Sequence, residues 1–144
     1  MFHLFAEVNP ASGLSILEAN FPRAIFVALG AIPGALSRYY LTRLATQRFG
    51  ASFPYGTFII NLTGSGLIGF LSTLMTKQLI STDLQALLII GFLGAYTTFS
   101  TYALDTSNLF RTGSRKRALL YWLGSPILGF ICVEVGIFFA SQML

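Results

Sequence analysis

Four hydroxyl side chains fall within five positions of one apolar stretch, and two glycines precede them. The residues are Gly91, Gly94, Thr97, Thr98, Ser100 and Thr101. In an unbroken helix such hydroxyls bond back to carbonyls of the preceding turn, which is common and harmless. The alternative is that the helix unwinds at the middle of a bilayer, which frees carbonyls that bind cations, and amides and hydroxyls that bind anions. The chemistry that this run favours is ion binding.

Three further polar residues lie within apolar stretches, where such groups are costly and usually functional. Asn61 either forms a hydrogen bond between helices, worth about 1 kcal/mol, or donates to a passing anion. Arg38 either extends to the membrane surface as an anchor or attracts anions into a vestibule. Glu134 indicates a proton or cation site by default, although no second carboxylate lies near it in the sequence.

The sequence offers no set of side chains for catalysis. His3 is the one histidine and Cys132 the one cysteine. The apolar stretches hold no paired carboxylates, and the glycines form no phosphate-binding loop after a strand. We therefore predict that the protein is not an enzyme, which leaves transport or membrane assembly as its role.

The composition indicates that a bilayer surrounds most of the chain. Of 144 residues only 9 are basic and 5 acidic, while 54% are hydrophobic and the mean hydropathy is +0.71. Soluble domains carry about 25% charged residues, so this chain lacks the polar surface that water requires. The net charge of +4 comes mostly from residues between the apolar stretches, which suits a membrane surface better than nucleic acid.

Four stretches meet the requirement of about 20 apolar residues for a membrane span. They cover about residues 23–44, 55–76, 83–105 and 118–143. Asn20 and Pro22 mark the expected start of the first helix, as a cap and a first-turn proline. We expect residues 1–20 to form an interfacial or disordered leader, and residues 21–144 to form a single four-helix transmembrane domain. Small residues, among them Gly30, Gly34, Gly64, Gly69, Ser125 and Gly129, are expected to let the helices approach closely.

Basic residues are unequally distributed between the two sides that four spans create. The first and third linkers, residues 43–55 and 106–117, contain six of them, Arg43, Arg48, Arg111, Arg115, Lys116 and Arg117. The remaining connecting and terminal segments contain Arg23 and Lys77. The positive-inside rule therefore predicts that the first and third linkers are cytoplasmic and that both termini are outside.

Several of these motifs together resemble the CrcB/Fluc fluoride channels of microbes. The run Gly94–Tyr102 is similar to the signature of that family's third span, and it is the most specific match. Weaker matches are Gly34–Arg38 in the first span, Asn61–Ser65 in the second, and Tyr121, Ser125 and Gly129, four residues apart, in the fourth. The resemblance covers about residues 23–144, with the spans in the same order.

The resemblance implies an all-α integral membrane protein with four transmembrane helices per subunit, the third broken at mid-membrane. It implies a dimer of antiparallel subunits in the plasma membrane that passes fluoride out of the cytoplasm down its electrochemical gradient and so relieves fluoride toxicity. A sodium ion at the dimer interface would be held by the backbone carbonyls of Gly94 and Thr97. The fluoride pore would be lined by Asn61, Thr98, Phe99, Ser100, Thr101, Tyr102, Tyr121 and Ser125, and the vestibule by Arg38 and Asp105.

Three features depart from the family pattern. Tyr102 replaces the usual phenylalanine, and its hydroxyl would either donate to fluoride or obstruct it. Asp105 replaces the usual glutamate and is one methylene shorter. The unequal basic residues favour one orientation, whereas an antiparallel homodimer needs two, so a pair with an oppositely oriented homologue is an alternative to the homodimer.

Two other functions remain open from the sequence. A proton-coupled exporter of the small multidrug-resistance type shares four short spans, but it should carry a glutamate in its first span, and residues 24–42 contain no acid. A non-transporting membrane assembly subunit would give no reason for the run of hydroxyl residues.

Overall fold

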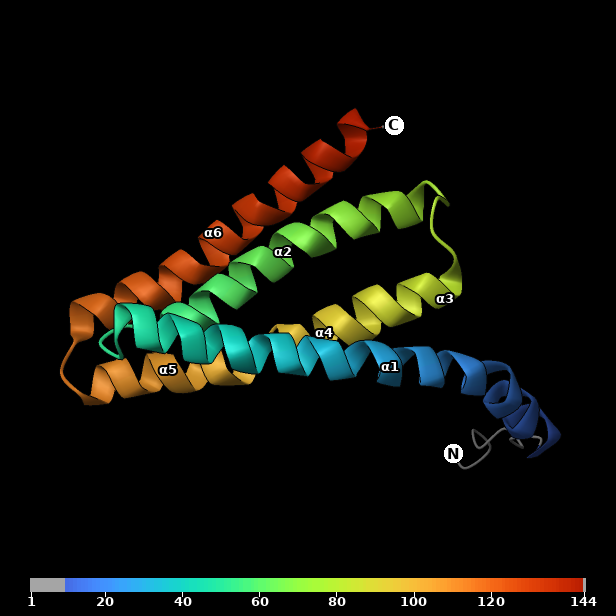
Figure 1. Ribbon diagram of the computed structural model, residues 1–144, viewed down its shortest axis with the longest axis horizontal. Coiled ribbons are helices and arrows are strands. Elements are labelled where there is room, and N and C mark those ends of the chain that lie inside the picture. The colour runs from blue at the N-terminus through green and yellow to red at the C-terminus, as the bar shows by residue number, and fades with distance from the viewer. Residues whose placement is uncertain (1–9, 144) are drawn as a thin grey trace, which may run out of the picture.

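The computed structural model describes residues 10–143, with side chains from residue 21 onward, and the chain in this range is helical apart from short loops (Figure 1). The elements in order are α1 (Pro10–Phe49), α2 (Tyr55–Thr76), α3 (Thr82–Gln85), η1 (Ala86–Leu93), α4 (Gly94–Tyr96), α5 (Phe99–Arg111) and α6 (Arg115–Gln142). Four segments are long and apolar enough to cross a membrane, namely Phe21–Phe49, Tyr55–Thr76, Thr82–Arg111 and Arg115–Gln142. The prediction of a multi-pass, all-helical membrane protein is confirmed.

The first helix begins earlier than the capping pattern predicted. α1 starts at Pro10 and continues through Asn20 and Pro22, so Pro22 lies inside a helix and not in its first turn. An internal proline removes one backbone hydrogen bond, which a long apolar helix tolerates. Of the predicted leader, residues 1–9 lie outside the described residues. The segment that is apolar enough to span begins at Phe21, close to the predicted boundary.

The connections alternate between the two ends of the bundle (Figure 1). The loops after α1 and after α5 lie at one end, and the loop after α2 lies at the other end, on the same side as the C-terminus. The six basic residues of the first and third linkers therefore lie at one end of the molecule. Alternation of this kind is what four membrane spans require.

Two close helix pairs form the bundle, α1 with η1 and α2 with α6. In the first pair, a Cβ atom added to Gly34 would lie 2.3 Å from the Phe92 carbonyl oxygen. In the second pair, a Cβ on Gly69 would lie 2.2 Å from the Val133 carbonyl oxygen. Only glycine permits backbones to approach so closely, so the predicted close packing is confirmed at these positions.

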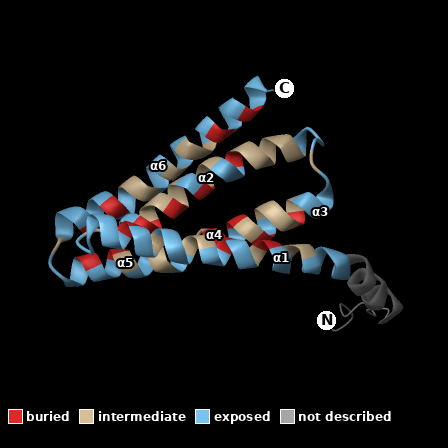
Figure 2. Cartoon of the chain, viewed as in Figure 1, coloured by how far each residue is buried: buried red, intermediate tan, exposed pale blue. Residues whose placement is uncertain are grey.

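Exposed residues occur along every long helix (Figure 2), and many of them are large and hydrophobic. Buried side chains form two small clusters, one of Ile60, Leu93 and Tyr96, and one built on Leu109, Ala118 and Tyr121. The first cluster lies beside the junction of α4 and α5, and the second toward the end that carries the basic linkers. A chain with so much apolar surface exposed is suited to lipid or to another apolar partner.

Candidate ion-binding site

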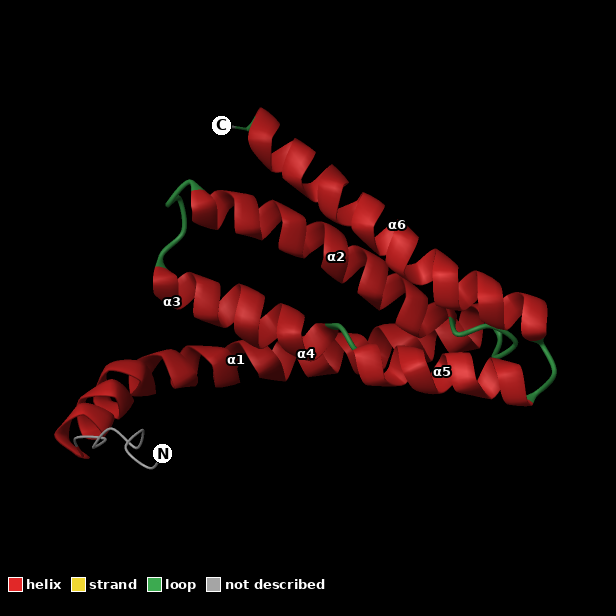
Figure 3. Cartoon of the chain, turned by 180° about the vertical axis from the view of Figure 1, so that it is seen from behind, coloured by secondary structure: helices red, strands yellow, loops and turns green. Residues whose placement is uncertain are grey.

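The third spanning segment is not one regular helix. η1 is a π-helix, in which amides bond to carbonyls five residues earlier, and it passes into the short α4. Thr97 (φ −83°, ψ 159°) and Thr98 (φ −153°, ψ 117°) then have extended backbone, and α5 begins at Phe99. Figure 3 shows this segment as a short loop between α4 and α5. We call Thr97 and Thr98 the interruption.

Hydroxyl groups of the interruption serve both helices that flank it. The Thr97 hydroxyl donates to the Leu93 carbonyl at 2.9 Å, as an ordinary helical threonine does. The Thr98 hydroxyl accepts from the Thr101 amide at 3.3 Å, which makes Thr98 the N-cap of α5. Back-bonding and unwinding, which the sequence presented as alternatives, therefore occur at adjacent residues. Gly94 stays helical, so the nonhelical part is shorter than the glycines suggested.

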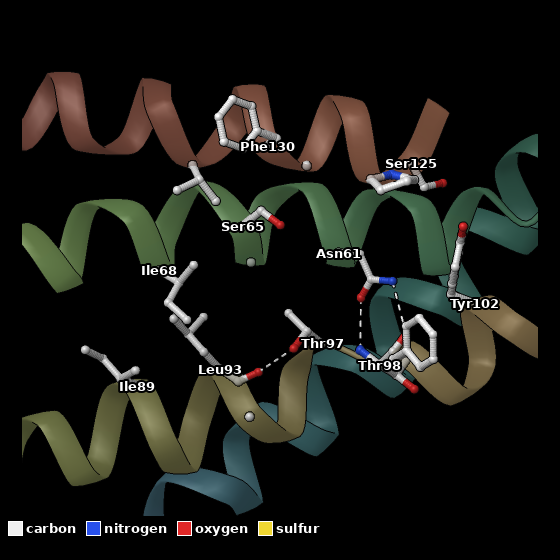
Figure 4. A pocket seen from close by; sticks show the side chains of 16 residues that line it. Asn61, Ser65, Ile68, Ile89, Leu93, Thr97, Thr98, Tyr102, Ser125 and Phe130 are labelled. Atoms are coloured by element: carbon white, nitrogen blue, oxygen red, sulfur yellow. Dashed lines mark hydrogen bonds between the residues drawn. The ribbon is translucent and has the colours of Figure 1, made fainter. Parts of the chain in front are cut away.

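Asn61 on α2 holds the interruption in place (Figure 4). Its Nδ2 donates to the Thr98 carbonyl at 3.1 Å, and its Oδ1 accepts from the Thr98 amide at 2.9 Å. The side-chain amide thus gives the Thr98 N–H the partner that it lacks outside a helix, and it adds a second bond at the Thr98 carbonyl. One N–H of the amide remains for another acceptor, since Asn carries two donors. The Thr98 amide is not available to the Gly94 carbonyl, its partner in a continuous helix.

A positive charge lies next to the interruption. Nη1 of Arg38, half-buried on α1, donates to the Thr97 carbonyl at 3.4 Å. Arg38 and Asn61 therefore bind the carbonyl and the N–H of one peptide group, that between Thr97 and Thr98, from two different helices.

A cavity of about 510 Å³ lies beside the interruption, between α2, the third spanning segment and α6. We call it the inner cavity. Its polar lining consists of Asn61, Ser65, Thr97, Thr98, Tyr102 and Ser125, and its other lining residues are apolar or glycine. None of the lining residues is charged. Ser125 Oγ is buried and has no hydrogen-bond partner within the described part of the chain, so a ligand could use this donor.

The aromatic rings of Phe99 and Tyr102 line the inner cavity, and the ring of Tyr121 lies beside that of Tyr102. The Phe99 ring lies 5.7 Å from that of Tyr102, and the Tyr102 ring lies 5.2 Å from that of Tyr121. Phe99 lines the cavity although 80% of its surface is exposed. A single chain therefore leaves the cavity open on the side of Phe99.

A second cavity, of about 460 Å³, lies toward the end with the basic linkers. We call it the outer cavity. Its lining includes Thr101, Asp105 and Arg117, and it is therefore the cavity that contains charged side chains. Thr57 Oγ1 donates to Asp105 Oδ2 at 2.7 Å, and Arg117 Nη1 donates to the Ser52 carbonyl at 3.3 Å.

The predicted pore and vestibule residues divide among three places. Those at the inner cavity are Asn61, Thr98, Phe99, Tyr102 and Ser125, together with Gly94 and Thr97 of the predicted sodium site. Those at the outer cavity are Thr101 and Asp105. Ser100, Tyr121 and Arg38 line neither cavity in a single chain. The Ser100 hydroxyl lies 3.2 Å from that of Thr98, and Tyr121 is wholly buried in the second core cluster.

Two residues with a part in the site were not singled out from the sequence. Thr57, buried on α2, is the partner of Asp105 and lies one turn before Asn61. Residues four apart in a helix lie on the same face, so the position of Asn61 could have indicated Thr57 from the sequence. Pro126 lines the inner cavity from the interior of α6, and a proline inside a span is itself a signal of a freed carbonyl.

Side-chain clusters do not provide a metal site in the part of the chain that the structure describes. No group of three His, Cys, Asp or Glu residues there is close enough to hold a metal ion. Glu134 is exposed on α6 and lines neither cavity.

Comparison with known proteins gives one consistent result. Residues 25–137 match the family described as "CrcB-like protein, Camphor Resistance (CrcB)". A protein of Trichormus variabilis is 54% identical over 115 residues, 78% of this chain and 84% of the relative. One from Synechococcus sp. is 51% identical over 79% of this chain and 88% of the relative, and one from Synechocystis sp. is 45% identical over 88% and 98%. All three are named "Fluoride-specific ion channel FluC".

Proposed function

Because the chain belongs to the CrcB-like protein family, we propose that it is a fluoride-specific ion channel that lets cytoplasmic fluoride leave down its electrochemical gradient. The observation that supports this most is the inner cavity, where neutral donors and aromatic rings meet at a nonhelical segment without a charged lining residue. Passive loss of fluoride across the plasma membrane would relieve its toxicity. A channel makes and breaks no covalent bond, so this function is not enzymatic. The relatives, too, are named as channels and not as enzymes.

The lining fits the physical requirements of fluoride. Fluoride is small and strongly hydrated, so it crosses only where donors replace its water. The free N–H of Asn61, the Ser125 hydroxyl and the positive edge of the Phe99 ring are neutral partners of this kind. Weak partners let the ion leave again, which conduction demands. A lysine or arginine in the lining would hold the ion more strongly.

Hydroxyl groups connect the two cavities. The Thr98 hydroxyl at the inner cavity donates to Thr101 Oγ1, which lies at the outer cavity, at 3.1 Å. Rotation of these hydroxyls would expose a donor to an anion moving between the cavities. We propose that this is the path of the ion, with the interruption near the middle of the membrane.

We propose further that a second subunit in the opposite orientation closes the inner cavity. Phe99 is 80% exposed there, and a Cβ on Gly94 would meet no atom closer than 4.0 Å, so this side can accept another chain. The partner is a second copy or, given the unequal basic residues, an oppositely oriented homologue. The two cases differ when cells express this chain alone. C-terminal tags found on both faces of the membrane would show that the chain inserts in both orientations and does not require a homologue.

We propose that a structural sodium ion binds the backbone carbonyls of Gly94 and Thr97. The Gly94 carbonyl lacks its helical donor because Asn61 occupies the Thr98 amide, and Gly94 is exposed. The Thr97 carbonyl accepts one long bond from Arg38, which leaves its second lone pair. These are two oxygens of one chain, and we propose that the same two oxygens of the second subunit complete the site. Sodium would then bind the clustered carbonyl oxygens and hold the two interruptions together.

The proton-coupled exporter is the less favoured alternative. Glu134 is the intramembrane carboxylate that it would need, and Glu134 is exposed on α6 outside both cavities. The assembly-subunit alternative gives no reason for the cavity at the interruption.

Release of fluoride from proteoliposomes, read with a fluoride-selective electrode, tests the proposed function. We expect fast release of fluoride, retention of chloride and no dependence on a pH gradient, in the natural protein and in Glu134→Gln alike. Release that follows the pH gradient, or is lost in Glu134→Gln, would favour the exporter. No release from folded protein would favour the assembly subunit.

A further inference from the structure

A proline in α6 leaves one backbone carbonyl without its helical partner. Pro126 lies inside α6 and has no N–H, so the carbonyl of Trp122, four residues earlier, cannot receive the usual hydrogen bond. An unsatisfied carbonyl within a membrane protein is costly, and another donor normally replaces the lost one.

The donor that replaces it is the side chain of Tyr102. The Tyr102 hydroxyl, on α5, donates to the Trp122 carbonyl at 2.5 Å. This short bond joins α5 to α6 next to the inner cavity, which both Tyr102 and Pro126 line. Phenylalanine, which has no hydroxyl, could not make this bond.

We propose that Tyr102 is a positioning residue whose hydroxyl proton is held by the carbonyl that Pro126 frees, so that Tyr102 presents its ring and not its proton to the ion. The ring is then fixed between those of Phe99 and Tyr121, at 5.7 Å and 5.2 Å between centroids. A phenol has only one O–H, and a proton committed to a carbonyl is not available to fluoride. Its oxygen lone pairs repel an anion, which favours contact with the ring edge.

The hydrogen bond can be observed independently of transport. Trp122 is the one tryptophan of the chain, so tryptophan labelled at its carbonyl carbon gives a single new NMR signal for the protein in lipid bilayers. In Tyr102→Phe we expect this signal to move upfield, as it does when a carbonyl loses a hydrogen bond. The matched control is Tyr96→Phe, which removes a hydroxyl bonded to Thr63 at 2.9 Å and should leave the signal unchanged.

Pro126→Ala supplies a second variant for the same bond. Alanine restores an N–H that can bond to the Trp122 carbonyl within the helix. We therefore expect Tyr102→Phe to shift the signal much less in the Pro126→Ala background than in the natural protein. An equal shift in both backgrounds would overturn the part assigned to Pro126.

Fluoride titration decides whether the hydroxyl leaves the carbonyl to bind the ion. This step rests on the proposed function, whereas the carbonyl signal does not. In a sample of the natural protein that conducts, we expect saturating fluoride to leave the Trp122 signal in place, with chloride as the control. A fluoride-dependent upfield shift would overturn the proposal. Absence of flux in the natural protein would instead contradict the proposed function, with the hydrogen bond still measurable.

Discussion

The inner and outer cavities are of similar size, about 510 Å³ and 460 Å³, but they differ in chemistry. Asp105 and Arg117 line the outer cavity, whereas the inner one is lined by neutral polar groups, apolar side chains and aromatic rings. Charge acts over several ångströms and suits the gathering or repulsion of ions near water. Short-range donors suit the place where the ion must shed its water.

The difference indicates a division of labour along the proposed path. Changes at the inner cavity should alter whether fluoride passes at all, and changes at the outer cavity should alter only how often it arrives. Each variant below tests this division, and three of the four are paired with a control from the other region or from outside both.

The largest effect is expected for Phe99→Ile. Isoleucine removes the ring edge that faces the ion with a modest change in volume, so fluoride flux should be abolished in the proteoliposome assay. The control is Phe110→Ile, at the far end of the same helix and outside both cavities, which should conduct normally. Undiminished flux in a folded Phe99→Ile protein would refute a role for the ring.

Asn61→Ala should have the next largest effect. It removes both hydrogen bonds to Thr98 and the free amide donor, so we expect flux to fall by about 10- to 100-fold, the equivalent of one or two strong hydrogen bonds. Asn108→Ala at the outer cavity is the matched control and should change flux by less than about threefold. Equal losses in the two variants would contradict the division of labour.

Gly64→Ala should have a smaller effect on the same site. The added Cβ would lie 2.2 Å from the Thr97 methyl carbon, so Thr97 must shift, at a cost of about 1–3 kcal/mol. We expect lower thermal stability and a several-fold loss of flux. Gly124→Ala, where an added Cβ meets nothing within 4 Å, should match the natural protein in both measurements.

Asp105→Asn should have the smallest effect, and in the opposite direction. Asparagine keeps an oxygen for the Thr57 hydroxyl but removes a negative charge that repels anions. Flux should rise by about threefold or less at low ionic strength, in the range of a single partly exposed charge. The increase should shrink as salt is added. A large loss of flux at every salt concentration would place Asp105 among the essential groups.

Sequence reasoning predicted the helices and their packing more fully than it predicted the site. Apolar length and small residues such as Gly34 and Gly69 are properties of a single segment of sequence. Four spans and close helix contacts could therefore be predicted without knowing which helix packs against which. The extended backbone at Thr97 and Thr98 falls within the run of hydroxyl residues that indicated unwinding. Its place within a membrane stays a prediction.

The hydrogen-bond partners in the site could not be predicted from spacing. Asn61 and Thr98 lie 37 residues apart and in different spanning segments, so spacing could not indicate the two bonds between them. Donation by Asn61 to an ion stays a prediction. The hydroxyl of Tyr102 likewise had two possible uses, and its partner is a backbone carbonyl, which carries no sequence signal except the proline four residues later. The π-helical turn of η1 has no signal in the sequence that we identify.

The central claim is that the ion passes between neutral partners at the interruption. Measuring whether fluoride contacts the Asn61 side chain tests this claim most directly. Distance-sensitive NMR between fluorine and nitrogen can be recorded on the protein in lipid bilayers, with nitrogen-labelled asparagine and saturating fluoride. The account predicts that fluoride attenuates one side-chain amide signal, and that this signal is absent in Asn61→Ala. A conducting sample in which fluoride leaves the Asn61 amide signal unaffected would contradict it.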